Sequence, residues 1–281
     1  MKYRTSGLLC ALCILLPGRV LADDIVLTGK RVLDKDTFIS ATTITFKGDA
    51  LVVTNGFKLT LEGTKSITFE GTPRVISFEP RDGRLQGDPG RSPGPVILQT
   101  PFLAGTSLRI ENVGEDGIKG VDGATGPQGP HGYQGTQRDW NPWNGCIGGS
   151  NGTPGGQGGD GGNGGTGGNG GTGGSIVFNV KTGFWNGTIA RLDLVVTGGN
   201  AGSGGAPGSG GPGGQGGEGA PGNLHCGGTG PGPIGPMGRP GLAGVPGAPG
   251  NAGLIIDVNG NSLPAKLNDL DKLLYNRPVS H

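Results

Sequence analysis

The sequence predicts a mainly β protein with polyglycine-II helices. We expect an N-terminal β-meander or small β-solenoid, a four-segment antiparallel polyglycine-II bundle with a strand-pair insert, and a short C-terminal helix. Three observations lead to this fold class. Of 281 residues, 66 are Gly and 22 are Pro, and only 32% are apolar, against about 45–50% in an ordinary soluble domain. Apolar and polar residues alternate near the N-terminus, and glycine recurs every third residue beyond it. A large, conventionally packed enzyme core is therefore excluded.

Residues 1–22 are expected to be a secretory signal peptide. Lys2 and Arg4 give a positive start, residues 7–16 are apolar, and residues 20–22 supply the small side chains that a signal peptidase reads. The apolar stretch is too short to cross a bilayer, so no membrane span is expected. The mature chain is expected to be secreted, to the periplasm, the cell surface or the extracellular space, after cleavage near Ala22.

The charge of the mature chain argues against two classes of partner. Removing Lys2, Arg4 and Arg19 from the 22 basic residues leaves 19 against 21 acidic ones, a net charge of −2. This balance predicts neither nucleic acid nor an anionic membrane as a partner.

Residues 23–113 are expected to form a β-domain. Apolar residues two positions apart, such as Ile44 with Phe46 and Ile67 with Phe69, recur every seven to nine residues with glycine between them. Alternation with a period of two, broken by glycine turns, indicates short strands. Its regularity favours a meander or a small β-solenoid.

Residues 114–253 contain four blocks with a strict three-residue glycine period, beginning at Gly114, Gly152, Gly199 and Gly232. A period of three is typical of the polyglycine-II helix, which has no internal hydrogen bonds. Its main-chain N–H and C=O groups must therefore find partners in neighbouring segments or water. Repetition in one register through four blocks predicts an ordered structure.

Two arrangements satisfy these main-chain groups: three chains wound as in collagen, or four segments of one chain side by side. Blocks one and four have one Gly per triplet with Pro, whereas blocks two and three are rich in Gly-Gly-X. Because two glycines per triplet clear two faces, we expect blocks two and three inside a bundle and the others at its edges. A monomer is favoured, and a collagen-like homotrimeric stalk is the alternative.

Two apolar segments interrupt or follow the blocks. Residues 175–197 are expected to form a strand-pair insert around Phe184 and Trp185, and residues 254–281 a strand followed by a short helix. The insert and residues 254–256 are expected to extend the core of the β-domain. Leucines at helical spacing predict the helix, with a trimerising coiled coil as the alternative: Leu263, Leu267, Leu270 and Leu274.

Only Cys146 and Cys226 remain after cleavage of the signal peptide. In an oxidising compartment one disulfide is the simplest interpretation, and free thiols or an intermolecular bridge are the alternatives. If blocks two and three run antiparallel, both cysteines fall at the same end of the bundle. In a parallel trimer they would lie at different levels.

The Gly-Gly-X blocks, joined by short turns and closed by cysteine, resemble the polyglycine-II bundle proteins. This group includes the glycine-rich springtail antifreeze proteins and the tip adhesins of phage tail fibres. The resemblance covers roughly residues 114–253 and implies a bundle fold, with ligand binding by distal loops in the adhesins. Blocks one and four are also similar to collagen-like surface proteins of bacteria.

The sequence contains no recognisable catalytic or metal-binding motif. His131, His225 and His281 stand outside any nucleophile or metal motif, and the acidic residues lack calcium-site spacing. The glycine blocks lack the Gly-Lys-Ser/Thr of a phosphate loop. We therefore expect a non-enzymatic protein with no cofactor and no metal.

A loop between blocks one and two holds two of the three tryptophans. Exposed aromatic rings beside Asn supply the apolar area and hydrogen bonds that glycan or protein recognition needs; the alternative is that the rings cap the bundle end. We expect an adhesin-like protein that binds a surface glycan or protein. The candidate ligand-binding residues are Tyr133, Arg138, Trp140, Asn141, Trp143, Asn144 and His225.

Block two carries small polar residues three positions apart, and therefore roughly 9 Å apart in such a helix. A regular polar row is compatible with ice binding, the third functional alternative, but the simpler interpretation is a solvated edge. The row consists of Asp160, Asn163, Thr166, Asn169 and Thr172.

Overall fold

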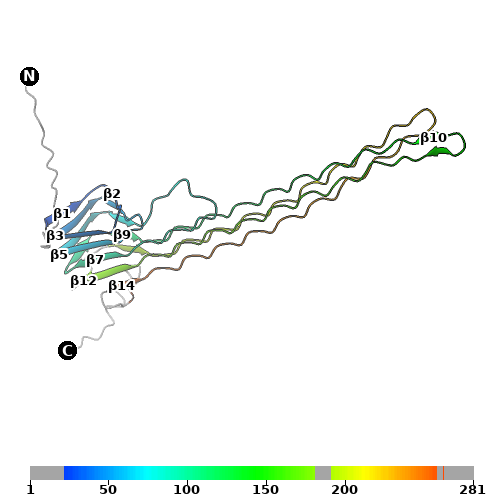
Figure 1. Ribbon diagram of the computed structural model, residues 1–281. Coiled ribbons are helices and arrows are strands. Elements are labelled where there is room, and N and C mark those ends of the chain that lie inside the picture. The colour runs from blue at the N-terminus through cyan, green and yellow to red at the C-terminus, as the bar shows by residue number, and fades with distance from the viewer. Residues whose placement is uncertain (1–21, 181–190, 258–261, 263–281) are drawn as a thin grey trace, which may run out of the picture.

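Two parallel β-sheets wind the N-terminal region and three later segments into a β-solenoid (Figure 1). The computed structural model describes residues 22–180, 191–257 and 262. Successive side chains of a strand point to opposite faces, so the period-two alternation fills the interior from every coil. The seven-stranded sheet consists of β1 (Ala22–Leu27), β3 (Thr37–Gly48), β5 (Leu59–Gly71), β7 (Val96–Thr100), β12 (Ile176–Val180) and β14 (Ile255–Asp257) in this order, with β8 (Leu103–Gly105) also beside β5. The five-stranded sheet consists of β13 (Leu192–Val195), β9 (Leu108–Glu111), β6 (Arg74–Ile76), β4 (Leu51–Val53) and β2 (Lys30–Val32).

An irregularity in β3 and β5 divides the larger sheet into two parts. The register of this strand pair shifts between Ala41 and Thr43. On the far side of β5, β7 pairs with the first half of the strand and β8 with the second half. A Cβ atom on Gly63 would lie 2.4 Å from the carbonyl oxygen of Ser66, so the corner in β5 requires glycine.

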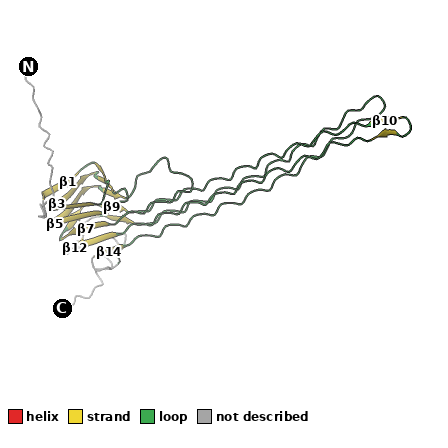
Figure 2. Cartoon of the chain, in the orientation of Figure 1, coloured by secondary structure: helices red, strands yellow, loops and turns green. Residues whose placement is uncertain are grey.

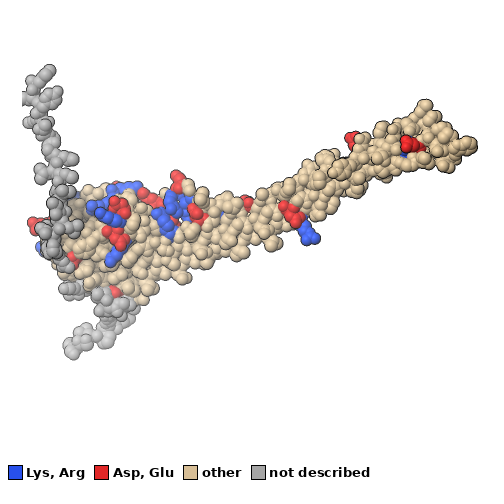
Figure 3. All heavy atoms as spheres, in the orientation of Figure 1, with Lys and Arg blue, Asp and Glu red and all other residues tan. Residues whose placement is uncertain are grey.

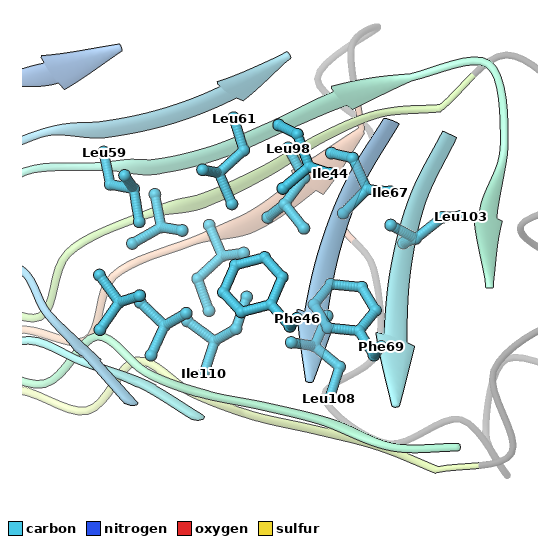
Figure 4. Close-up of a cluster of buried hydrophobic side chains, with 14 of the residues drawn as sticks. Ile44, Phe46, Leu59, Leu61, Ile67, Phe69, Leu98, Leu103, Leu108 and Ile110 are labelled. Carbon is cyan, nitrogen blue, oxygen red and sulfur yellow. The ribbon is translucent and has the colours of Figure 1, made fainter. Parts of the chain in front are cut away.

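The hydrophobic core lies inside the solenoid (Figure 4). Phe46 and Phe69, on adjacent strands, stack with ring centroids 5.0 Å apart. The expectation that the later apolar segments extend this core is confirmed. Their buried residues belong to the same cluster: Ile176, Phe178, Leu192, Leu194 and Ile255.

Five connections lie at one corner of the solenoid, each between a strand of the smaller sheet and the next strand of the larger one. The first two of these connections are short, and the later three are long. They comprise residues 33–36, 54–58, 77–95, 112–175 and 196–254. The last two form two hairpins that run side by side as a long stalk (Figure 1).

The stalk contains four extended glycine threads joined by main-chain hydrogen bonds. We call them thread 1 (residues 114–135), thread 2 (152–174), thread 3 (199–217) and thread 4 (232–253). Glycine N–H groups of thread 1 donate to thread 3, and those of thread 2 to thread 4, between parallel neighbours. Bonds from thread 2 to thread 1, from thread 3 to thread 2 and from thread 4 to thread 3 join antiparallel neighbours. Threads 2 and 3 therefore bond to all the others, and threads 1 and 4 lie at the edges.

The register of the sheets continues unchanged into the threads. Leu108 of β9 pairs with Leu192 of β13, 84 residues later, and the Asp116 side chain of thread 1 accepts the N–H of Asn200, also 84 residues later. Ile176 of β12 pairs with Ile255 of β14, and Asp160 of thread 2 meets Arg239 of thread 4, in both cases 79 residues apart. The parallel sheets therefore set the alignment of the parallel threads.

Asp and Asn side chains reinforce this alignment. An edge N–H group of one thread would otherwise face only solvent, and a carboxylate or amide oxygen of the parallel neighbour accepts it. The bonds between threads 2 and 4, each 2.8 Å long, join Asp160 to Arg239, Asn163 to Leu242 and Asn169 to Ala248.

Proline completes the same pattern near the far end of the stalk. Continuing the 79-residue spacing, Pro233 and Pro236 of thread 4 lie opposite Pro154 and Gln157 of thread 2. Proline has no N–H group, so no acceptor is needed there. Gln157 therefore has no main-chain donor opposite it, and a slip of one triplet that placed Asp160 opposite Pro236 would lose the hydrogen bond of Asp160.

Asn112 occupies the point where the solenoid passes into the stalk. Its buried side chain donates to the carbonyl oxygens of Gly94 (3.0 Å) and Ser175 (3.1 Å). Its main-chain N–H donates to Val195, and its carbonyl oxygen accepts from Gly174. One residue therefore connects the ends of three successive coils.

The first of the long connections, residues 77–95, braces the base of the stalk. The N–H of Ile118 donates to Asp88, and that of Gly90 donates to Asn169. The Arg91 guanidinium forms two hydrogen bonds with Glu115, from Nε (2.9 Å) and Nη2 (2.7 Å), and lies 4.3 Å from the Phe78 ring centroid. The Arg91 hydrogen bond holds the pKa of Glu115 below its ordinary value of 4.5, although burial opposes this shift.

Of the two strand arrangements predicted from the sequence, a meander or a small β-solenoid, the meander is wrong. A meander would pair successive strands antiparallel, whereas every pair within the two large sheets is parallel. The insert at 175–197 is not a strand pair, because β12 joins the larger sheet and β13 the smaller. Each segment adds another coil, so its strands contact the preceding coil and not each other.

The predicted polyglycine-II bundle with a C-terminal helix is also corrected. No helix occurs among the described residues, and the threads have no regular secondary structure (Figure 2). The organising elements are the two parallel sheets, and glycine N–H groups bond to neighbouring threads instead of along their own thread. The signal peptide, the Phe184–Trp185 turn and the leucines of the expected helix lie outside the described residues.

Gly208→Ala is expected to destabilise the protein by about 3 kcal/mol or more, because its Cβ would lie 2.0 Å from the carbonyl oxygen of Ala124. The midpoint of thermal unfolding should fall by about 6 °C or more. Gly227→Ala is the matched control, since its Cβ meets nothing within 4 Å. Equal midpoints for the two variants would contradict close packing of the threads.

Acid should weaken the brace at the base of the stalk. Because the folded-state pKa of Glu115 is lowered, its contribution to stability is present above about pH 4.5 and is lost as the pH falls through the lowered value. Glu115→Gln should therefore be less stable than wild type at neutral pH, with a difference that shrinks below about pH 4.5. Thermal unfolding across this range, with Glu70→Gln as an exposed control, tests the expectation; a constant difference would refute it.

Candidate functional site

Two loops meet at the far end of the stalk and form the candidate site, which we call the tip (Figure 1). One is a hairpin of β10 (Asp139–Asn141) and β11 (Gly145–Ile147), which are antiparallel. The other, residues 220–229, joins threads 3 and 4. Both loops stand far from the solenoid because the four threads separate them from it.

A disulfide joins the two loops. Cys146 and Cys226 are bonded with their Cα atoms 5.7 Å apart, which places both cysteines at the same end of threads 2 and 3. Asn223 orders the second loop, since its Oδ1 accepts the N–H groups of His225 (3.1 Å) and Cys226 (2.7 Å). Its Nδ2 donates to the carbonyl oxygen of Arg138 (2.8 Å) in the first loop.

The two tryptophans of the hairpin have different surroundings. Trp140 stacks on His225 with ring centroids 4.6 Å apart, and it is 47% exposed. Trp143, in the turn, is 91% exposed. The Asn141 side chain accepts the N–H groups of Trp143 (2.9 Å) and Asn144 (3.2 Å), so the backbone of the turn is held although the Trp143 ring is free.

Most of the residues expected from the sequence come together at the tip. Trp140, His225 and the two cysteines lie in contact, and Arg138 contributes its carbonyl oxygen. Tyr133 is 82% exposed but belongs to thread 1, where its main chain exchanges hydrogen bonds with Thr153. Tyr133 thus lies on the side of the stalk, below the loops.

Sequence reasoning missed two residues of the second loop, Asn223 and Leu224. Leu224 is 92% exposed, although it is a large apolar residue. The signals were present: an Asn three positions before Cys226 is typical of a side-chain-capped turn, and a leucine between Asn and His is unusual in a polar loop.

The tip and the stalk carry few charged groups. In Figure 3 the charged side chains on the visible face gather over the solenoid and the base of the stalk, with isolated groups beyond them. A ligand at the tip would therefore meet mainly aromatic and apolar area and neutral hydrogen-bonding groups.

The polar row of thread 2 has a structural use. Asp160, Asn163 and Asn169 accept main-chain N–H groups of thread 4. These oxygens are therefore already engaged within the chain, and they are not a free, regular array of acceptors.

Comparisons with protein-family models, with curated proteins and with solved structures find no match to this chain. The part of the chain that the structure describes contains no helix that is long and apolar enough to cross a membrane. Within the same residues, no three His, Cys, Asp or Glu side chains group so that they could hold a metal ion.

Loss of the disulfide should destabilise the tip. Replacing Cys146 and Cys226 together by Ser opens a loop spanning 80 residues and is expected to cost about 4 kcal/mol on the chain-entropy model. Thermal unfolding with and without a reductant measures this cost. Wild type should become less stable on reduction and the double variant should not respond; equal stability of oxidised wild type and the variant would contradict the expectation.

Proposed function

We propose that this protein is a secreted, non-enzymatic, adhesin-like binding protein that uses the tip to hold a surface glycan or a protein. The observation that carries the proposal is the Trp143 ring, 91% exposed on a turn whose backbone is fixed by Asn141. An exposed aromatic residue on an ordered backbone loses little conformational entropy when it binds, so it suits an anchor at an interface.

The surroundings of Trp143 support the same function. Trp140 and Leu224 add apolar area, while Asn144 and Asn223 lie beside them in the two loops. The disulfide and the stack of Trp140 on His225 hold the loops together before any ligand arrives. Preorganisation of this kind reduces the entropy that binding costs.

The length of the stalk fits a binding function at a distance. A thread of about 20 residues, at roughly 3 Å per residue, is about 60 Å long. The solenoid can therefore remain near the surface or partner that carries the protein while the tip reaches a ligand beyond it.

The two alternatives have less support. A collagen-like trimer would need partners in other chains, yet one glycine N–H group per triplet in threads 1, 3 and 4, and both in each Gly-Gly-X triplet of thread 2, already donate to carbonyl groups of the same chain. Ice binding would need a free polar row, and Asp160, Asn163 and Asn169 of that row already bond to thread 4. A monomeric binding protein therefore remains the proposal.

Replacement of Trp143 should remove ligand capture without unfolding the protein. A glycan array and a cell-surface capture assay with the mature protein identify the ligand, and Trp143→Ala should then bind about 30-fold more weakly, as expected for a hot-spot aromatic residue. The double variant Trp140→Ala/Trp143→Ala should lose capture. Leu242→Ala is the control, because Leu242 is 72% exposed on thread 4, away from the tip.

The thermal midpoint of each variant must be measured alongside binding. Undiminished capture by a folded double variant would overturn the proposal. So would equal losses in the double variant and in Leu242→Ala, because they would place recognition along the stalk.

A further inference from the structure

A hollow on the solenoid, far from the tip, is lined by three arginines. It has a volume of about 390 Å³ and lies where the smaller sheet begins, beside β6, β9 and β13. We call it the arginine hollow, and its polar lining consists of Thr72, Arg74, Thr106, Ser107, Arg109, Arg191 and Asp193.

The charges beside the hollow do not balance. Arg74 and Arg109 are directly paired on neighbouring strands, and like charges at such positions repel. Glu111 bonds to both guanidinium groups, and Asp193 accepts from Arg109 at 2.9 Å. Two carboxylates thus serve two arginines.

Glu111 takes part in this network as an anion. Burial alone would raise the pKa of Glu111, but hydrogen bonds from Arg109 and Arg74 outweigh burial and lower it. The ion pairs are therefore complete without a third cation.

Arg191 is that third cation. Its carbonyl oxygen accepts the N–H of Leu108, which fixes the backbone beside Ser107. Its side chain is exposed, and no acidic side chain within the described ranges forms an ion pair with it. The hollow therefore has a net charge of about +1, counting Glu111 with its lining.

The neutral groups of the hollow match a hydroxylated ligand. Thr106 and Ser107 donate their hydroxyl hydrogens to the carbonyl oxygen of Gly71, at 2.7 and 3.0 Å. Their oxygen atoms keep lone pairs that can accept hydrogen bonds from a ligand. Pro73 and Leu108 contribute apolar surface to the same hollow.

We propose that the arginine hollow binds the carboxylate of an acidic sugar, with Arg191 as the principal anion-binding group. A guanidinium holds a carboxylate through two parallel hydrogen bonds. The sugar hydroxyls donate to Ser107 and Thr106, and a C–H face of the ring lies on Pro73. The site does not depend on the function proposed for the tip.

Calorimetric titration of the full mature protein tests the site with three probes: glucuronate, glucose and inorganic phosphate at equal ionic strength. Glucuronate should bind, glucose should not, and phosphate should bind more weakly than glucuronate. Arg191→Ala should weaken glucuronate binding at least about tenfold, because a charged hydrogen-bonded partner is lost. Arg191→Lys should recover only part of the affinity, since an ammonium group cannot form the bidentate pair.

Arg31→Ala is the matched control, because Arg31 is an exposed arginine on β2 of the same sheet, outside the hollow. It should bind glucuronate as wild type does, and so should Trp143→Ala. The proposal is overturned if glucuronate fails to bind, if glucose or phosphate binds as well as glucuronate, or if folded Arg191→Ala keeps the wild-type affinity.

Discussion

The stalk depends on hydrogen bonds between main-chain groups of neighbouring threads. None of the buried hydrophobic residues in the described chain belongs to the four threads, so side-chain burial does not hold them together. Each thread lacks internal hydrogen bonds and is satisfied only by its neighbours. A side chain at a position such as Gly161 would lie 2.2 Å from the carbonyl oxygen of Gly208, so this close approach requires glycine.

The solenoid supplies what the threads lack, a hydrophobic core and a fixed starting register. β9 and β13 deliver threads 1 and 3 already aligned, and β12 and β14 receive threads 2 and 4 in the same way. Because the spacing of 84 residues or 79 residues is the same in sheet and stalk, a slip would have to break both. Asn112, Arg91 and Glu115 secure the passage between the two parts.

The tip and the arginine hollow, the two proposed binding sites, differ in what holds their side chains in place. At the tip, the disulfide and side-chain caps order loops that have no core beneath them. In the hollow, the coil spacing alone places Ser107 beside Arg191 and Arg109 beside Asp193. The tip exposes aromatic and apolar side chains, whereas the hollow brings charged side chains together.

The sequence by itself determined which residues form the glycine blocks, which blocks lie at the edges or inside, which apolar positions are buried, and which two cysteines can pair. Each of these follows from local periodicity or composition. Tertiary structure alone decided that the strands pair in parallel and that Ile176 and Leu192 join different sheets. Period-two alternation reports which face is buried but not the direction of the neighbouring strand. The stack of Trp140 on His225, the hydrogen bond from Asn223 to Arg138 and the charge imbalance at Arg191 likewise arise between residues distant in sequence, so only the fold brings them together.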